Sequence, residues 1–538
     1  MIFVLSGCSC GGKSDWKVGY AGGAVSSNGG FAVVVGDYTY FINGVEDSTA
    51  KNGYGTPVKG SLVRIKTEEL AQGANAESAE VVIPKIFASS HYGTGKAYQT
   101  GVTVFDDYVY YGTPSTEKDK KGNVLNSNIV FQKTKLDGTK TSKIAEFDSM
   151  ATEYKFVKSG EEVYLIVVKT ENNVSTLKVY NENGNKVFER EGADSFVLPY
   201  DFEGDYIFWT DKVKDEDDQD KVFGAIYSYK FGDSQEKIVI NGADSRNGGS
   251  AEFGTQGRVF TVNTLVNDLL YFSYVSADTT DGTRSQYATL KIDQTVKHLT
   301  ALGENATETE KAEFVADNLA NYNACTSLGA TQAVVNAIVA TAKYNSATEI
   351  IYYDAEYGIM SYDYTQAEVA PYFGTKLVLD KGRIDIDTPS FIDIVDDYAY
   401  FADKNNLIHR IKLEDGATME QVTTIAKASW YNPEIVGGYM LLSLTGEPYN
   451  SYVYAFNLDM QADVATLYAE ELQDLTAGTS EYQEKLDELV DEYLADITNK
   501  TEFAVQSILD KKVGVMKKAD KTAVSSYMSA NYTSSSSN

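Results

Sequence analysis

A hairpin motif recurs eight times along the chain, and this repeat limits the fold more than any other feature of the sequence. Most copies have a two-residue turn of Gly, Asp, Asn or Glu type followed by an apolar, aromatic strand, as in Gly36-Asp-Tyr-Thr-Tyr-Phe41. The other copies begin at Asp106, Gly160, Gly204, Asn267, Thr348, Asp396 and Gly437. Because β-rich runs precede most of the turns, each copy predicts a β-hairpin.

Further strands follow each hairpin. Third strands are expected at Ser61–Lys66, Ala225–Lys230, Leu407–Lys412 and Tyr452–Asn457, and fourth strands at positions such as Lys237–Ile240 and Val422–Ala426. Four antiparallel strands form one blade of a β-propeller. The motif copies start 41 to 81 residues apart, against the roughly 40 to 50 residues that one blade needs.

The sequence therefore predicts an all-β fold, an eight-bladed β-propeller over residues 14–460, with seven blades as the alternative because the unit at Thr348 is irregular. The longest interval contains residues 305–345, whose apolar spacing predicts a two-helix insertion between blades. The last unit lacks an outer strand, and Ser14–Tyr20 is expected to supply it. Closure of the sheets into a ring would remove exposed strand edges.

Composition excludes several classes of protein. A chain of 538 residues with 43% hydrophobic residues can bury an extensive core, so general disorder is excluded. The formal net charge of -30 repels polyphosphate, which argues against nucleic acid as a partner. No apolar stretch approaches the roughly 20 residues of a membrane-spanning helix.

Residues 461–538 change to helical periodicity and end in a disordered Ser-rich tail. Leu486, Leu489, Val490, Tyr493, Leu494 and Ile497 lie on one helical stripe. We expect these amphipathic helices to pack on one another and on the propeller. A docking helix for another envelope protein is the alternative.

The amino-terminal segment, residues 1–13, resembles a lipoprotein signal remnant and tether. Leu5-Ser6-Gly7-Cys8 is similar to the lipobox of bacterial lipoproteins, although no Lys or Arg precedes Cys8. The resemblance implies cleavage of a signal peptide before Cys8 and lipidation of its thiol. It also implies an extracytoplasmic protein, anchored at the cell membrane by lipid alone. Cys10 and Cys325 remain, too few for a disulfide framework and without the spacing of a metal site.

The repeats resemble a second family. Tyr400-Phe-Ala-Asp403 followed by Leu407-Ile-His-Arg410, and Phe208-Trp-Thr-Asp211, are similar to the YWTD-type β-propeller of LDL-receptor-like proteins. Bacterial lipoproteins carry similar propellers of largely uncharacterised function. The likeness extends over about Ser14 to Met460, although no complete YWTD is present. It implies a binding scaffold without catalytic residues.

Connection lengths predict which face binds a ligand. Turns from the first to the second strand and from the third to the fourth are short, whereas other connections, such as residues 43–60 and 112–128, are long. In an antiparallel blade the two kinds of connection lie at opposite ends, so the long loops should share one face, which is the expected recognition surface. The lipid anchor should lie on the opposite face.

Candidate ligand-binding residues are the aromatic side chains expected in these long loops, which suit stacking on sugars or contact with peptide. They are Tyr54, His91, Tyr92, Tyr98, Trp430, Tyr431 and Tyr449.

No catalytic residue is predicted. His91, His298 and His409 are the only histidines, and no catalytic or nucleotide-binding motif accompanies them. We expect no metal or other cofactor. The acidic run from Asp211 to Asp220 leaves calcium as an alternative, although it lacks the ligand order of an EF-hand.

These features together predict a cell-surface, lipid-anchored, non-catalytic binding protein whose partner is a protein or glycan of the envelope. Two alternatives stay open, namely a propeller glycan lyase or hydrolase and a structural component of an envelope complex.

Overall fold

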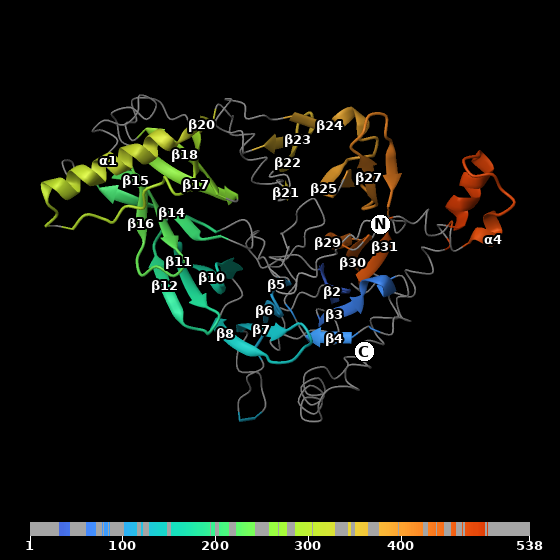
Figure 1. The fold of residues 1–538 in the computed structure, drawn as a ribbon, viewed down its shortest axis with the longest axis horizontal. Coiled ribbons are helices and arrows are strands. Elements are labelled where there is room, and N and C mark those ends of the chain that lie inside the picture. The colour runs from blue at the N-terminus through green and yellow to red at the C-terminus, as the bar shows by residue number, and fades with distance from the viewer. Residues whose placement is uncertain are drawn as a thin grey trace, which may run out of the picture. The chain divides into compact units, whose positions relative to one another are not determined.

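Antiparallel sheets that follow one another along the chain make up the fold (Figure 1). The computed structural model describes residues 32–43, 61–70, 78, 80–83, 86, 102–115, 120–121, 128–147, 152–193, 195–198, 204–214, 222–242, 258–266, 268–276, 286–303, 305–328, 343–345, 350–363, 376–395, 397–422, 429–436, 438–445, 453–458, 465, 468–489 and 492. They fall into two compact units, unit 1 (Met1–Met150 and Arg383–Asn538) and unit 2 (Ala151–Gly382).

Unit 1 holds four sheets, each with its strands in chain order. Blade 1 is β1 (Ala32–Val35), β2 (Tyr38–Asn43), β3 (Ser61–Lys66) and β4 (Glu80–Ile83), and blade 2 is β5 (Thr103–Phe105), β6 (Tyr108–Pro114), β7 (Ile129–Lys135) and β8 (Ser142–Phe147). Blade 7 is β25 (Ser390–Val395), β26 (Tyr398–Ala402), β27 (Ile408–Lys412) and β28 (Met419–Gln421), and the three-stranded sheet is β29 (Ser429–Val436), β30 (Tyr439–Thr445) and β31 (Val453–Asn457).

Unit 2 holds four further blades and the helix α1 (Glu308–Ala324). Blade 3 is β9 (Thr152–Ser159), β10 (Glu162–Glu171), β11 (Val174–Asn181) and β12 (Lys186–Glu191), and blade 4 is β13 (Ser195–Val197), β14 (Tyr206–Lys214), β15 (Val222–Lys230) and β16 (Lys237–Asn241). Blade 5 is β17 (Arg258–Val266), β18 (Leu269–Ser276), β19 (Gln286–Lys291) and β20 (Thr326–Leu328), and blade 6 is β21 (Lys343–Asn345), β22 (Ile350–Ala355), β23 (Gly358–Asp363) and β24 (Lys376–Asp380). A 3-10 turn, η5 (Lys381–Arg383), follows β24.

This succession of antiparallel blades confirms the all-β propeller. The prediction of eight blades is wrong, because the described residues form seven complete four-stranded blades, the number that the alternative gave, and one sheet of three strands. No described residue after Asn457 adds a fourth strand to β29–β31. The segment Ser14–Tyr20, expected to supply that strand, lies outside the described residues.

Tight turns explain how the repeat folds. Gly36, Asp106 and Gly160 each take a positive φ at the first turn residue, of 56°, 51° and 60°. A left-handed residue at this point reverses the chain in two residues without splaying the strands. Six of the eight predicted turn positions are two-residue links between a first and a second strand; the connections before β14 and β22 are longer.

The core lies between adjacent sheets because the second strands are apolar on both faces. In β14, Ile207 and Trp209 pack with side chains of blade 3, whereas the intervening Phe208 packs with side chains of blade 5. Successive side chains of a strand point to opposite faces, so one strand serves two interfaces. This explains the continuous apolar run at this position of the repeat.

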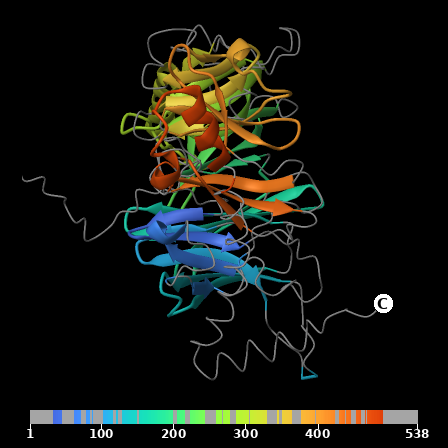
Figure 2. The same ribbon diagram turned by 90° about the vertical axis from the view of Figure 1, so that its right-hand side faces the viewer.

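In unit 1 the first and the last sheets are neighbours, since β1 contacts β29. Figure 2 shows the orange strands β29–β31 next to the blue strands of blade 1. This contact is the one that closure of the series predicts for these two sheets.

Within unit 1, the described helical residues of the carboxyl-terminal segment pack against strands of two sheets. Besides α4 (Ala469–Leu472), residues 480–489 are helical. Leu472, Leu486 and Leu489 share a buried cluster with Tyr400 and Met440, which belong to β26 and β30. The predicted stripe beyond residue 492 lies outside the described residues.

Two connections depart from the predicted sorting of long loops. The range 305–345, predicted as a two-helix insertion between blades, has one helix among its described residues, α1, which lies between β19 and β20 inside blade 5, and it also contains the strands β20 and β21. In blade 6 the link between β22 and β23 has only two residues, Glu356 and Tyr357, whereas residues 364–375 separate β23 from β24. The link that contains α1 and the link of residues 364–375 therefore both join a third strand to a fourth strand, a connection that was predicted to be short. Periodicity detects a helix but does not reveal which strands flank it.

Candidate binding groove

The helix α1 is fixed to blade 4 by polar side chains that act like a neighbouring strand. Asn321 Nδ2 donates to the backbone oxygens of Val239 and Lys297, at 2.7 Å each, and its Oδ1 accepts from Lys297 N at 2.9 Å. Asn318 Oδ1 accepts from Asn241 N at 2.9 Å and its Nδ2 donates to Asn241 O at 3.1 Å. These amides satisfy backbone groups on the outer edge of β16.

A short backbone pairing continues this cover. Ile238 and Leu299 exchange two hydrogen bonds of 2.8 Å, so the segment that follows blade 5's third strand runs along β16. The side chains of Ile238, Leu299 and Phe314 form a buried cluster with Tyr227 packed against it. The segment and the helix are thus joined by an apolar seam.

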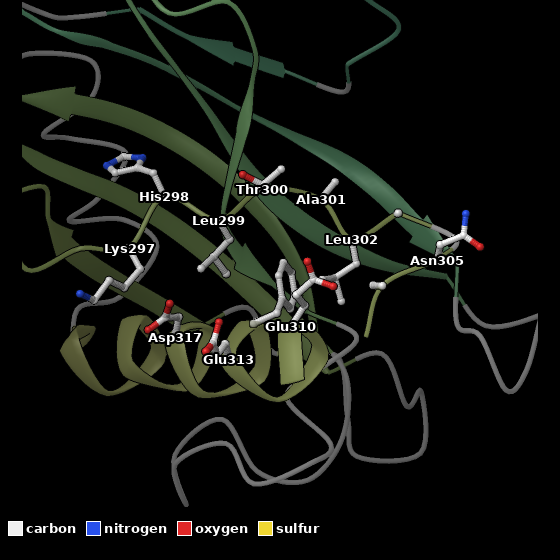
Figure 3. Close-up of a pocket in the computed structure, with 13 residues that line it drawn as sticks. Lys297, His298, Leu299, Thr300, Ala301, Leu302, Asn305, Glu310, Glu313 and Asp317 are labelled. Atoms are coloured by element: carbon white, nitrogen blue, oxygen red, sulfur yellow. The ribbon is translucent and has the colours of Figure 1, made fainter. Parts of the chain in front are cut away.

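A groove of about 590 Å³ lies between α1 and this segment. Its lining includes Lys297, Leu299 and Leu302 from the segment and Glu310, Glu313, Phe314 and Asp317 from α1. Figure 3 shows Leu299 turned toward α1, the carboxylates of Glu313 and Asp317 on the helix, and the His298 ring turned away from it.

The groove has two chemically different walls. Phe314 and Leu299 are 7% and 6% exposed and form the floor, whereas Leu302 is 43% exposed at the rim. Glu310, Glu313 and Asp317 are spaced by three and four residues, which places them on one face of the helix. One wall is therefore acidic, and the other presents the apolar side chain of Leu302 at its rim.

Glu310 also has a structural role in starting the helix. Its carboxylate accepts hydrogen bonds from the Thr307 backbone N and Oγ1, at 2.7 and 2.8 Å, and Thr307 caps the helix in return. These hydrogen bonds from Thr307 lower the pKa of Glu310, so its negative charge is secured at neutral pH.

His298 supports the segment from the side away from α1. Its ring stacks on Tyr206 with centroids 4.7 Å apart, and Nδ1 lies 2.9 Å from Ser228 Oγ. Burial lowers the pKa of His298, and the charge of Lys230 lowers it further. The neutral ring acts here as a packing element of blade 4.

Two of the seven aromatic candidates from the sequence lie in the part of the chain that the structure describes. Trp430 and Tyr431 lie in strand β29, not in a loop, so their prediction as loop residues is wrong. The pairing of β29 shifts register between Tyr431 and Glu434, directly after these two residues. The remaining candidates lie outside the described residues, as does the lipidation site: Tyr54, His91, Tyr92, Tyr98, Tyr449 and Cys8.

Sequence reasoning missed the groove residues. The signal was available in the spacing of Glu310, Glu313 and Asp317 around Phe314 on a helical pattern. The opposing wall was not foreseeable, because the position of residues 297–306 depends on the pairing of Leu299 with Ile238.

The acidic and histidine candidates have ordinary structural partners where they are described. Asp211 pairs with Arg190, and His409 Nε2 lies 3.3 Å from Asp403 Oδ2. Among the described residues, no group of three or more His, Cys, Asp or Glu side chains is arranged to hold a metal ion. In the same part of the chain, no helix has the length and apolar character to cross a membrane.

Comparison with known proteins gives a likeness of fold only. No family model and no curated protein matches the chain. The β-propeller domain of the Trilobed protease from Pyrococcus furiosus is 11% identical, with a TM-score of 0.32, covering 73% of this chain and 96% of that one. BamB from Moraxella catarrhalis is 11% identical, with a TM-score of 0.29 and coverage of 77% and 99%. The Porphyromonas gingivalis dipeptidyl peptidase 4 is 9% identical, with a TM-score of 0.38 and coverage of 80% and 58%. Similarity at this level identifies neither a family nor a function.

Proposed function

We propose that this chain is an extracytoplasmic, lipid-anchored propeller that binds another protein without catalysing a reaction. The observation that carries the proposal is the groove beside α1, which combines a buried apolar floor, an exposed apolar rim residue and a row of carboxylates. Apolar area surrounded by charged groups is typical of surfaces that hold protein segments.

The construction of the groove suits binding. The amides of Asn318 and Asn321 fix α1 to β16, so both walls are in place before a ligand arrives. A pre-formed site does not spend binding energy on ordering its own walls. Phe314, the phenyl ring in the lining, is buried in the floor, which favours a protein segment over a stacked sugar ring.

A non-catalytic role agrees with how Glu310 and His298 of the lining are held. Glu310 is engaged by Thr307, and the histidine of the lining is turned away and packed on Tyr206 (Figure 3). A general acid or base must reach a substrate proton within about 2.6–3.2 Å. Neither side chain is offered to the groove in that way.

Site-specific photocrosslinking in the native host tests this function. A photoreactive amino acid at Leu302, in the groove, should give a discrete crosslinked protein, whereas the same residue at the exposed Val187 on β12 should not. Equal crosslinking from both positions, or none from Leu302, would count against a binding role for the groove.

The anchor is tested separately by labelling with radioactive palmitate. Label should enter the protein and disappear in the Cys8→Ala variant, because Cys8 is the acylated residue of the lipobox that the sequence resembles. Absence of label from the unaltered protein would remove the anchor from the proposal and leave the groove unaffected.

A further inference from the structure

We infer that the groove beside α1 holds an extended segment of a partner protein in which basic and apolar side chains alternate. The inference rests on the proposed binding function and adds the chemistry of the partner. It follows from the contrast between the two walls.

The acidic wall favours a partner with cationic side chains. Glu313 and Asp317 line the groove against a single basic lining residue, Lys297, and Glu310, whose carboxylate is held by Thr307, adds its negative charge. The whole chain carries a net charge of -30, which adds long-range attraction for a basic partner and repulsion for an acidic one. The partner is therefore expected to bring Lys or Arg to the α1 side.

The rim of the opposite wall favours apolar side chains of the partner. Leu302 is 43% exposed at the rim, and Leu299 and Phe314 close the floor below it. Covering Leu302 removes apolar surface from water, which favours binding. The partner is expected to direct Leu-like side chains to this side.

Spacing along the helix favours an extended partner. At 1.5 Å per residue, Glu313 and Asp317 are separated by about 6 Å along the axis of α1. Alternate residues of an extended strand lie roughly 6.8 Å apart and point to the same side. Lysines at every second position can therefore meet successive carboxylates while the intervening residues face Leu302.

Fluorescence anisotropy with synthetic peptides tests this chemistry on the full-length protein. The probe is a labelled peptide of alternating Lys and Leu; the comparison peptides replace Lys by Glu or Leu by Ser. The Lys/Leu peptide should bind most tightly, and added salt should weaken its binding, because the carboxylates lie at a solvated rim.

Variants of the groove give the matched control. Glu313→Gln with Asp317→Asn should lower affinity for the Lys/Leu peptide roughly tenfold, the effect of removing two partly solvated ion pairs. The control is Glu308→Gln with Glu161→Gln, which removes the same amount of charge. Glu308 lies on α1 outside the groove lining and Glu161 lies in the β9–β10 turn, so affinity should stay nearly unchanged. Leu302→Ser should weaken binding roughly fivefold.

Several outcomes would overturn the inference. Equal binding of the Glu/Leu peptide, or equal losses in the groove and control variants, would show that the acidic wall does not select a basic partner. Tighter peptide binding after replacement of the lysines within residues 511–521 would show that the chain's own basic segment occupies the groove. If the Leu302 crosslink forms but no peptide binds, the partner chemistry is wrong while the proposed binding function stands.

Discussion

Two asparagines of α1 form hydrogen bonds with the outer edge of blade 4 that a further β-strand would otherwise form. Each side chain amide carries a donor and an acceptor, as a peptide group does, so Asn318 and Asn321 can pair with backbone groups of β16 and of Lys297. The two asparagines are themselves 2% and 1% exposed, so their amides pair with these backbone groups away from water. A helix thus covers an edge that in a blade is usually left to solvent.

Replacing Asn321 by Ala should lower the free energy of unfolding by about 2–4 kcal/mol, because the buried Val239 carbonyl and the part-buried N and O of Lys297 lose their partner. The midpoint of urea unfolding measures this loss. Asn305→Ala is the control, since Asn305 is exposed in the groove lining. Equal midpoints for the two variants would contradict the role assigned to Asn321.

His298 should make stability depend on pH. Its pKa in the folded protein lies below the ordinary value of about 6.5 that the unfolded chain has. The neutral ring therefore contributes stability above pH 6.5, and this contribution is lost as pH falls through the folded-state pKa.

Unfolding in urea at pH 7.5 and pH 5.5 should show a larger loss of stability for the natural protein than for His298→Gln, whose amide does not titrate. The difference between the two proteins isolates this residue from the carboxylates that titrate in both. The same pH dependence in both proteins would exclude His298 as the cause.

At the scale of elements, a basic residue of the third strand joins blade 1 to blade 2. In blade 1, Arg64 pairs with Glu80, lies over the Tyr38 ring at 4.9 Å, and donates from Nη1 to Leu136 O of blade 2 at 3.2 Å. Blade 7 repeats the ion pair and the ring contact, with Arg410 over the Tyr398 ring and paired with Glu420. The Tyr-x-Tyr of the second strand thus serves to hold a cation as well as to fill the core.

Arg64→Met should destabilise unit 1 by about 1–3 kcal/mol, because it leaves Glu80 without its partner and removes the bond to blade 2. Thermal unfolding followed by circular dichroism measures the effect. Lys66→Met on the same strand is the control, since the Lys66 side chain is 41% exposed and its ion pair with Glu68 is long, at 3.9 Å. A Tm shift no larger than that of the control would rule out the link between blades.

The hairpin turns have a backbone requirement that can be measured without steric effects. A Cβ at Gly36 would meet no atom within 4 Å, but Gly36 has a φ of 56°. Gly36→Ala should therefore cost about 1 kcal/mol from the left-handed conformation alone. Gly303→Ala, which is equally unobstructed and without a positive φ, should cost less, and an equal cost would refute the explanation.

For the whole molecule, the net charge of -30 makes self-repulsion a general destabilising term. Raising sodium chloride from about 0.01 to about 0.15 M shortens the Debye length from roughly 30 to 8 Å and should raise the Tm by a few degrees. Differential scanning calorimetry at the two salt concentrations checks this. An unchanged or lower Tm would mean that local ion pairs, such as that between Arg64 and Glu80, outweigh the repulsion.

The repeat could be predicted because each turn and strand leaves a local signal, and most strands lie where those signals placed them. Predicted β3, Ser61–Lys66, agrees with the observed strand, whereas the last strand of blade 7 is Met419–Gln421 rather than Val422–Ala426. Short outer strands carry few apolar residues, so their signal is weak. The position of α1 within blade 5 and the opposing wall of the groove depend on contacts such as Asn321 with Val239, 82 residues apart, which periodicity does not encode.

Because β1 contacts β29, unit 1 can complete its packing only near the end of translation. The roughly 400 residues between these strands take about 20–80 s to translate, so β1 leaves the ribosome long before its neighbour exists. Unit 2, by contrast, is encoded by one uninterrupted stretch, Ala151–Gly382. Newly made chains therefore carry a first sheet whose contact with β29 is still missing for most of their synthesis, a state that chaperones can hold until the last hairpin arrives.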